Sequence, residues 1–219
     1  GFDIQPPANA GNYPVYLSGG NDYVTIRNSK ITSTGNATAG IFFKDGADNY
    51  QYITIGGTSS SQGNLFVFDA TDKAIETDAT FDDLMLYLTI SNNTFTASGS
   101  GNHWAVYLKS AQVVTMQGNT FGSLVEFESS ALTTTQLTIG GSGSGLGNTF
   151  SPTNPSSTTR GGLNFDVTGT GLLSNVTITQ NNFNGNTKGI DFSTATTFMD
   201  ESTVSINNNR FSGNTTAVE

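Results

Sequence analysis

A short apolar unit recurs along this chain of 219 residues, and no other feature constrains its fold as strongly. The first copy reads YVTIRNSKI from Tyr23. Its central apolar position is filled in turn by Ile26, Ile55, Ile90, Met116, Ile139, Ile178 and Ile206, at spacings of 29, 35, 26, 23, 39 and 28 residues. Repeats of about 20–50 residues are typical of solenoids, in which each copy buries its apolar side against the next. The chain is therefore predicted to be a stack of about seven coils.

Each repeat contains three short segments with the alternation of a strand. In the V-T-I segment, apolar residues alternate with Thr, as expected where one side of a strand is buried. The second segment carries a large apolar residue, which is Ile31, Phe66, Phe95, Phe121, Phe150, Phe183 or Phe211. The third begins at Gly40, Ala74, Ala105, Leu124, Gly162 or Gly189, and the last copy stops within it at residues 216–219. Three strands joined by Gly, Ser and Asn turns predict a triangular coil.

An asparagine stands two residues before the large apolar residue in six copies. These asparagines are Asn64, Asn93, Asn119, Asn148, Asn181 and Asn209, and Ser29 takes the place in the first copy. Asparagine tolerates left-handed backbone angles in turns, and stacked amides can hydrogen-bond to one another. We therefore expect an asparagine ladder that stabilises the fold, and not a row of binding residues.

The repeated V-T-I-x-x-N-x-F units, the G-I-x-F third strand and the asparagine row resemble the right-handed parallel β-helix superfamily, which is pectate-lyase-like in shape, and especially its secreted bacterial repeat members. The resemblance covers residues 13–219. It implies an all-β, right-handed parallel β-helix of about seven three-strand coils. Neither end carries a polar capping helix, so we expect both ends to be uncapped and residues 1–219 to be a single domain of a longer protein.

Composition narrows the class of partner. The formal net charge of −9 argues against nucleic acid, and no stretch approaches the roughly 18 apolar residues of a membrane span. With no Cys, thiolate metal sites and cysteine nucleophiles are excluded. The sequence favours an extracellular or cell-surface protein without membrane insertion, whose ligand is a cation or a neutral molecule.

The superfamily includes lyases, glycoside hydrolases, binding modules and adhesins, so the resemblance alone does not choose a function. The N-T-D, D-D, G-H-G and R-I-K set of polygalacturonases is absent, as are the D-P-H-D motif of alginate epimerases and the G-G-x-G-x-D-x calcium repeat. These departures favour a protein that is not an enzyme. His103, the only histidine, lies in a Gly-rich loop, and Trp104 after it has the parity of an inward residue.

Two columns of the third strand are expected to point outward from the coils. The first reads Tyr16, Phe42, Glu76, Tyr107, Glu126, Asn164 and Asp191, and the second reads Ser18, Lys44, Asp78, Lys109, Glu128, Asp166 and Ser193. Carboxylates on neighbouring coils would form a solvated face, hold a calcium ion, contact a glycan or act as a catalytic pair. The catalytic candidates are Glu126, Glu128, Asp166, Asp191 and Lys109, and the calcium candidates are Glu128 and Asp166.

A third outward column begins with Tyr23, Tyr52 and Tyr87, beside a column of Thr. Stacked Tyr residues can stabilise a sheet without any ligand, but exposed aromatic rings beside hydroxyl and amide groups also bind sugars. The predicted ligand-binding residues are Tyr23, Tyr52, Tyr87, Phe42, Tyr107, Glu126, Asn164 and Asp191.

The sequence thus predicts a noncatalytic, adhesin-like stalk module that binds a polysaccharide or surface glycan, without a cofactor unless calcium binds. One alternative is a polysaccharide lyase or glycoside hydrolase acting through the outward carboxylates. Another is a filament subunit that associates head to tail with its own copies.

Overall fold

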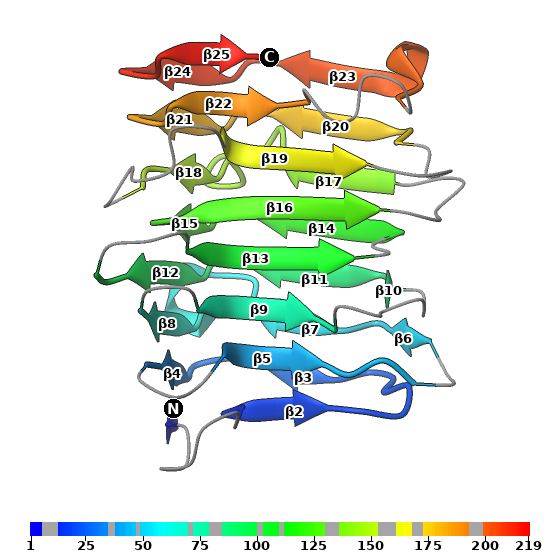
Figure 1. Cartoon of the computed structure of the whole chain (residues 1–219), viewed down its shortest axis with the longest axis vertical. Helices are drawn as coiled ribbons and strands as arrows, with labels where there is room; N and C mark the ends of the chain where they lie inside the picture. The colour runs from blue at the N-terminus through cyan, green and yellow to red at the C-terminus, as the bar shows by residue number, and fades with distance from the viewer. Residues whose placement is uncertain are drawn as a thin grey trace.

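The computed structural model describes residues 1–5, 13–34, 38–46, 49–69, 72–78, 85–99, 103–109, 112–129, 136–152, 161–167, 173–192 and 199–219. Within these ranges the strands form parallel sheets whose members stack in chain order along one axis (Figure 1). Three sheets run the length of the stack, and the chain visits them in turn. The predicted parallel β-helix with three strands per coil is therefore confirmed.

The V-T-I segments form a sheet of seven strands, which we call the VTI sheet. Its members are β3 (Thr25–Ile26), β7 (Thr54–Gly56), β11 (Leu88–Ser91), β14 (Val113–Gln117), β17 (Gln136–Gly140), β20 (Val176–Thr179) and β23 (Val204–Asn207). Adjacent strands pair in the register that the repeat predicts, with Ile26 beside Ile55 and Ile90 beside Met116. A two-stranded sheet of β6 (Tyr50–Gln51) and β10 (Met85–Leu86) precedes β7 and β11.

The second segments form an eight-stranded sheet, which we call the Phe sheet. It contains β1 (Asp3–Ile4), β4 (Lys30–Ser33), β8 (Leu65–Phe68), β12 (Thr94–Ala97), β15 (Thr120–Phe121), β18 (Thr149–Phe150), β21 (Asn182–Asn184) and β24 (Arg210–Ser212). The strand β1 was not predicted, because its segment lacks the Asn-x-Phe pattern. Ile4 nevertheless lies beside Ile31 and continues the apolar column.

The third segments form another eight-stranded sheet, which we call the acidic sheet. It contains β2 (Val15–Leu17), β5 (Ala39–Phe43), β9 (Lys73–Thr77), β13 (Trp104–Lys109), β16 (Leu124–Ser129), β19 (Gly161–Val167), β22 (Lys188–Asp191) and β25 (Thr216–Val218). Two short 3-10 turns, η1 (Ser60–Gln62) and η2 (Glu201–Thr203), complete the regular structure of the described residues.

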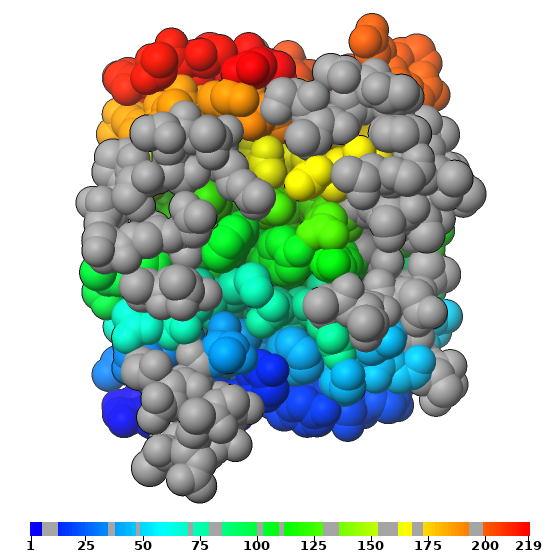
Figure 2. Space-filling view, in the orientation of Figure 1, coloured from blue at the N-terminus to red at the C-terminus, as the bar shows by residue number. Residues whose placement is uncertain are grey.

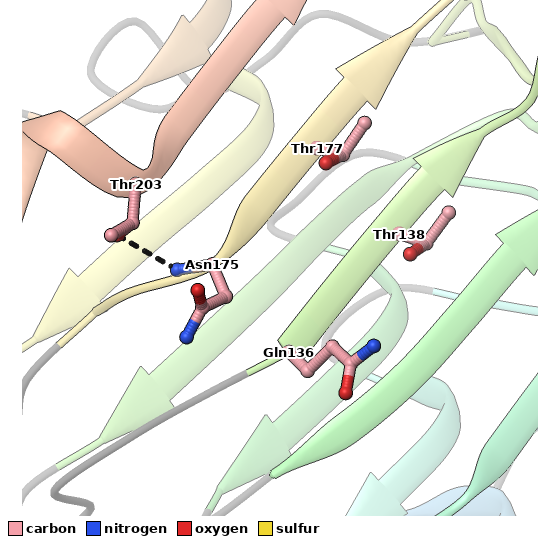
Figure 3. Close-up of a pocket in the computed structure, with 5 residues that line it drawn as sticks. All are labelled: Gln136, Thr138, Asn175, Thr177 and Thr203. Carbon is pink, nitrogen blue, oxygen red and sulfur yellow. Dashed lines mark hydrogen bonds between the residues drawn. The ribbon is translucent and has the colours of Figure 1, made fainter.

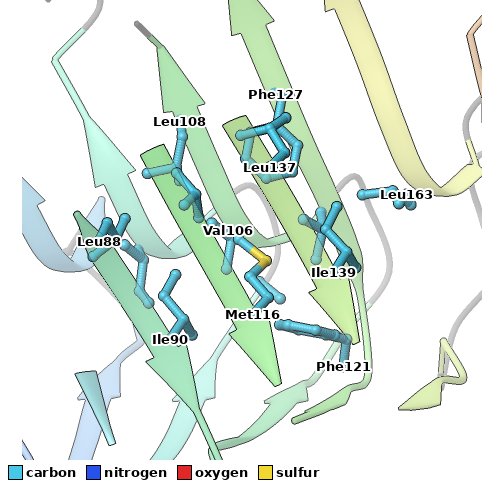
Figure 4. Packing of buried hydrophobic residues seen from close by; sticks show 14 of the residues in the cluster. Leu88, Ile90, Val106, Leu108, Met116, Phe121, Phe127, Leu137, Ile139 and Leu163 are labelled. Carbon is cyan, nitrogen blue, oxygen red and sulfur yellow. The ribbon is translucent and has the colours of Figure 1, made fainter. Parts of the chain in front are cut away.

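The core is a continuous apolar column between the three sheets (Figure 4). Phe rings of the Phe sheet stack from coil to coil, with centroids 5.0 Å apart between Phe95 and Phe121 and 4.9 Å apart between Phe121 and Phe150. Ile90 and Ile139 of the VTI sheet are fully buried against them. Because each coil covers the apolar side of the next, no coil needs a core of its own.

The asparagine ladder is confirmed. Each amide oxygen accepts hydrogen bonds from the backbone N–H and the side-chain amide of the asparagine one coil earlier, as at Asn119, which receives them from Asn93 at 2.9 and 3.1 Å. Ser29 joins through its backbone N–H, which donates to Asn64 at 3.1 Å. Left-handed backbone was expected at the ladder asparagines, but it occurs at the residue before them, as at Asn92 (φ 59°) before Asn93 and Gly118 (φ 66°) before Asn119. The ladder residues themselves do not have a positive φ.

A second, shorter ladder was not predicted. The buried side chain of Asn186 donates to Asn214 Oδ1 at 3.1 Å, and also to the carbonyl oxygen of Phe150 at 3.2 Å. No helix among the described residues has the length and apolar character required to cross a membrane.

Candidate functional site

The outer columns of the acidic sheet have the predicted register. In the first column, Tyr107 lies beside both Glu76 and Glu126, and Asn164 lies beside Asp191. In the second, Glu128 lies between Lys109 and Asp166. Figure 2 views the molecule from this side, where the coloured surface runs in chain order from the N-terminal to the C-terminal strands. Ser193 falls outside the described residues.

One of the alternatives for the outward carboxylates, a solvated face, is wrong for Glu126 and Asp191, and two other members of the first column are buried as well. Exposure is 7% for Phe42, 1% for Glu126, 5% for Asn164 and 2% for Asp191, although all four point away from the core. Strand alternation fixes the side of the sheet on which a residue lies, but not whether other groups cover that side. In the present arrangement these four residues offer little surface to a ligand. Tyr16, at the N-terminal end of the column, is 50% exposed and can be reached by a ligand.

The buried Glu126 carboxylate is held by Trp104, whose indole N–H donates to Glu126 Oε2 at 2.9 Å. The prediction that Trp104 points inward is therefore wrong. A bulge between Trp104 and Val106 adds one residue to β13, so Trp104 changes sides relative to the simple alternation. On the outer side it also lies under Lys73, whose Nζ is 5.6 Å from the indole centroid.

Lysines neutralise most of the carboxylates on this sheet. Lys109 Nζ lies 2.9 Å from Glu128 Oε1, and Lys188 Nζ lies 3.0 Å from Asp191 Oδ2. The Tyr107 hydroxyl donates to Glu128, and burial together with this carboxylate raises the pKa of Tyr107. Burial also raises the pKa of Glu76, although its ion pair with Lys73 opposes the change.

The two calcium candidates, Glu128 and Asp166, are neighbours on adjacent strands. Within the described residues, no group of three or more His, Asp and Glu side chains is arranged to hold a metal ion. Calcium prefers six to eight oxygen ligands, so these two carboxylates would need several further ligands. Calcium binding at this pair stays a prediction.

A buried polar cluster lies between the Phe sheet and the acidic sheet. His103 is 3% exposed, its Nδ1 is 2.9 Å from the carbonyl oxygen of Asp69, and its Nε2 has no hydrogen-bond partner. Asp72 is 6% exposed and its Oδ2 also lacks a partner. Burial and the nearby Asp69 carboxylate raise the pKa of Asp72 to about 8. The only histidine is thus a buried residue and not an exposed loop residue.

The VTI sheet carries the exposed aromatic column. Tyr23, Tyr52 and Tyr87 are 76%, 44% and 49% exposed. Their rings stack in parallel, with centroids 4.9 Å apart between Tyr23 and Tyr52 and 4.8 Å apart between Tyr52 and Tyr87. This set, which we call the Tyr stack, is separated by the VTI sheet from the core and lies on a different side of the solenoid from Glu126 and Asp191.

All three residues of the Tyr stack have left-handed backbone, with φ of 59° at Tyr23, 55° at Tyr52 and 58° at Tyr87. A bulky side chain in this region costs about 1–2 kcal/mol, which Gly or Asn largely avoids. Asn175, with φ 51°, occupies the same place in a later coil and illustrates the residue type that the backbone favours. The sequence pattern located the Tyr stack but gave no sign of this strain.

Beyond the Tyr stack the same face contains a polar depression of about 490 Å³. It is lined by Gln136, Thr138, Asn175, Thr177 and Thr203 (Figure 3). The Asn175 backbone N–H donates to Thr203 Oγ1 at 2.9 Å, which fixes one rim. None of the predicted ligand-binding residues lines this depression. It could have been found from the sequence by following the Tyr and Thr columns into the later coils.

The chain matches no protein-family model, and neither the curated proteins nor the solved structures include a significant match. The class of protein therefore comes from the fold and its outer faces. It is a parallel β-helix with one largely buried, ion-paired acidic side and another side of Tyr, Thr and amide groups, where Arg27 is the only charged residue in the outward columns of the described strands.

Proposed function

We propose that this chain is a noncatalytic carbohydrate-binding module of an extracellular or cell-surface protein, in which the β-helix acts as a rigid stalk. The observation that carries the proposal is the Tyr stack: three exposed rings are kept at positions where the backbone favours Asn or Gly. Strain of this kind persists where a function requires the side chain. Membership of the pectate-lyase-like superfamily, in its secreted repeat type, is part of the proposal, and the parallel β-helix supports it.

The chemistry of this side suits sugars. Pyranose rings present C–H groups that pack on aromatic rings, and hydroxyl groups that pair with donors and acceptors. The Tyr stack supplies the rings, and the half-buried hydroxyl of Thr89 lies beside it, in line with those of Thr115 and Thr138 in the next two coils. A β-helix also holds such groups in fixed positions, which lowers the entropic cost of binding.

The triple Tyr variant carries Asn in place of Tyr23, Tyr52 and Tyr87. We expect it to bind the glycan at least about 10-fold more weakly than the original chain, while its melting temperature changes little. The loss of two ring pairs, at about 0.5–1.5 kcal/mol each, is offset by relief of backbone strain. A glycan array and polysaccharide pull-down, with and without calcium, identify the ligand, and titration calorimetry measures the affinity of each variant.

Leu65→Asn is the matched control, because Leu65 is 39% exposed but lies on the Phe sheet. Its affinity for the glycan should equal that of the unsubstituted chain. If the chain binds no glycan under either calcium condition, or if the triple variant binds as well as the original, the carbohydrate-binding proposal is wrong.

A second candidate function is a polysaccharide lyase or glycoside hydrolase on the acidic sheet. The observation that favours it is the pairing of Glu128 with Asp166 on strands about 4.8 Å apart, close to the carboxyl separation of about 5–5.5 Å in retaining glycosidases. Glu76 in the adjoining column has a raised pKa, as a general acid requires. Against it, Glu128 is already engaged by Lys109 and Tyr107.

This candidate predicts release of reducing ends or unsaturated uronates from acidic polysaccharides, and loss of that activity in Glu128→Ala. Asp78→Asn serves as the control, because Asp78 pairs with Lys44 in the same column away from Asp166. Activity that survives Glu128→Ala would reject these residues as catalytic groups. Association between copies of the chain stays a prediction, which size measurement at several concentrations checks.

A further inference from the structure

The Tyr stack and the polar depression belong to one column of the VTI sheet. Paired registers place Val113 after Tyr87, and then Gln136, Asn175 and Thr203 in successive coils. Adjacent strands are about 4.8 Å apart, so the column from Tyr87 to Thr203 spans roughly 19 Å along the axis. Aromatic, short apolar and hydrogen-bonding side chains therefore follow one another on one continuous strip.

Only the ends of the Tyr stack offer a free ring face. Tyr52 is covered on both sides by parallel rings, at interplanar angles of 9° and 4°. Tyr87 is covered on one side alone, because Val113, the next residue in the column, has no ring and is much shorter than Tyr. The uncovered face of Tyr87 is turned along the axis toward the depression, and the side chain is 49% exposed.

The depression has the groups to bind hydroxyls and none to bind a charge. Gln136 and Asn175 contribute amides, which both donate and accept, and the hydroxyls of Thr138 and Thr177 do the same. The Thr203 hydroxyl already donates to the carbonyl oxygen of Asp200 at 2.9 Å and accepts from the Asn175 N–H, so it fixes the rim. Within the described residues, no hydrogen bond engages the side chains of Gln136, Thr138 or Thr177. Figure 3 draws one hydrogen bond among the five lining residues, from the Asn175 backbone N–H to Thr203 Oγ1. Arg27 carries the only charge in the outward columns of this sheet and lies at the opposite end of it.

We propose that this strip binds a neutral polysaccharide that runs along the solenoid axis. One sugar ring stacks on the free face of Tyr87, and the following units lie in the depression, where Gln136, Asn175 and Thr177 pair with their hydroxyls. This inference rests on the proposed carbohydrate-binding function and specifies its ligand class and its position. Acidic polysaccharides are excluded, because the strip lacks a cation at the depression and the whole chain has a net charge of −9.

The test measures affinity for soluble β-glucan, xyloglucan and galactomannan as neutral probes, and for polygalacturonate and alginate as acidic probes. The decisive variant is Gln136→Ala with Asn175→Gly, since Gly retains the left-handed backbone of Asn175 (φ 51°) while removing its amide. We expect it to bind the neutral probe at least about 10-fold more weakly and to keep the circular dichroism and melting temperature of the original chain. Leu65→Asn, on the Phe sheet and away from the strip, should change affinity less than about 2-fold.

The outcomes separate this inference from the proposed function. If the triple Tyr variant loses binding while the depression variant retains it, the module binds sugar elsewhere and the depression is not part of the binding site. If acidic probes bind as tightly as neutral ones at about 0.5 M salt, where long-range repulsion is screened, the assignment of a neutral ligand is wrong. If neither these probes nor any glycan of the array binds, both proposals are wrong, whereas binding of acidic glycans alone would leave the carbohydrate-binding proposal standing and reject the neutral ligand.

Discussion

Replacing Asn119 with Ala is expected to lower the free energy of unfolding by about 3–5 kcal/mol. Asn119 Oδ1 accepts from the backbone and side chain of Asn93, and its Nδ2 donates to the carbonyl oxygen of Ile90 at 2.8 Å and to Asn148 Oδ1 at 2.9 Å. Alanine leaves these groups unpaired in a site that is 1% exposed. An unpaired buried polar group costs about 1–3 kcal/mol, and several are created at once.

Denaturant unfolding followed by circular dichroism measures this loss. Asn184→Ala is the control, because Asn184 is an exposed asparagine of the Phe sheet outside the ladder, and its substitution should change stability by less than about 0.5 kcal/mol. Equal stabilities of the two variants would mean that the ladder does not stabilise the fold.

The protein is expected to lose stability as the pH rises from about 4 to about 8, through Asp72. The pKa of Asp72 is raised from 3.8 to about 8 in the folded chain, first by burial and then by the Asp69 carboxylate, whereas Lys73 opposes the change. Between these two values the folded state binds more protons than the unfolded state, so the free energy of unfolding falls with rising pH. Below about pH 4 the contribution is fully present, and above about pH 8 it is lost.

The substitution Asp72→Asn removes this titration with little change in shape. At about pH 9 the variant should be more stable than the original chain by about 2–4 kcal/mol, a figure reduced from the full shift because solvent screens part of the interaction. Unfolding free energies at several pH values measure the difference. Asp22→Asn, at an exposed position, should leave the pH dependence as it was. A pH dependence that persists unchanged in Asp72→Asn would show that Asp72 does not govern it.

The sequence by itself determined the coil. Period-two alternation in the V-T-I segments places Ile55 and Ile90 inside, and the repeat brings equivalent residues side by side, as their pairing confirms. Asn64 to Asn209 were recognised as a ladder because one residue type recurs at one turn position in six coils. The predicted outer columns of the acidic sheet also have the correct register, since a parallel stack of identical coils permits no other order.

Only the tertiary structure decided which outward residues a ligand can reach. Alternation assigns Glu126 and Asp191 to the outer side but carries no information on what covers them, and both are buried. The bulge in β13 moves Trp104 to that side, because one inserted residue reverses parity. The left-handed φ of the Tyr stack and the depression beyond it also depend on backbone geometry, which residue types at a single position do not specify. The sequence thus defined the inside of the solenoid, and the folded backbone defined its outer surface.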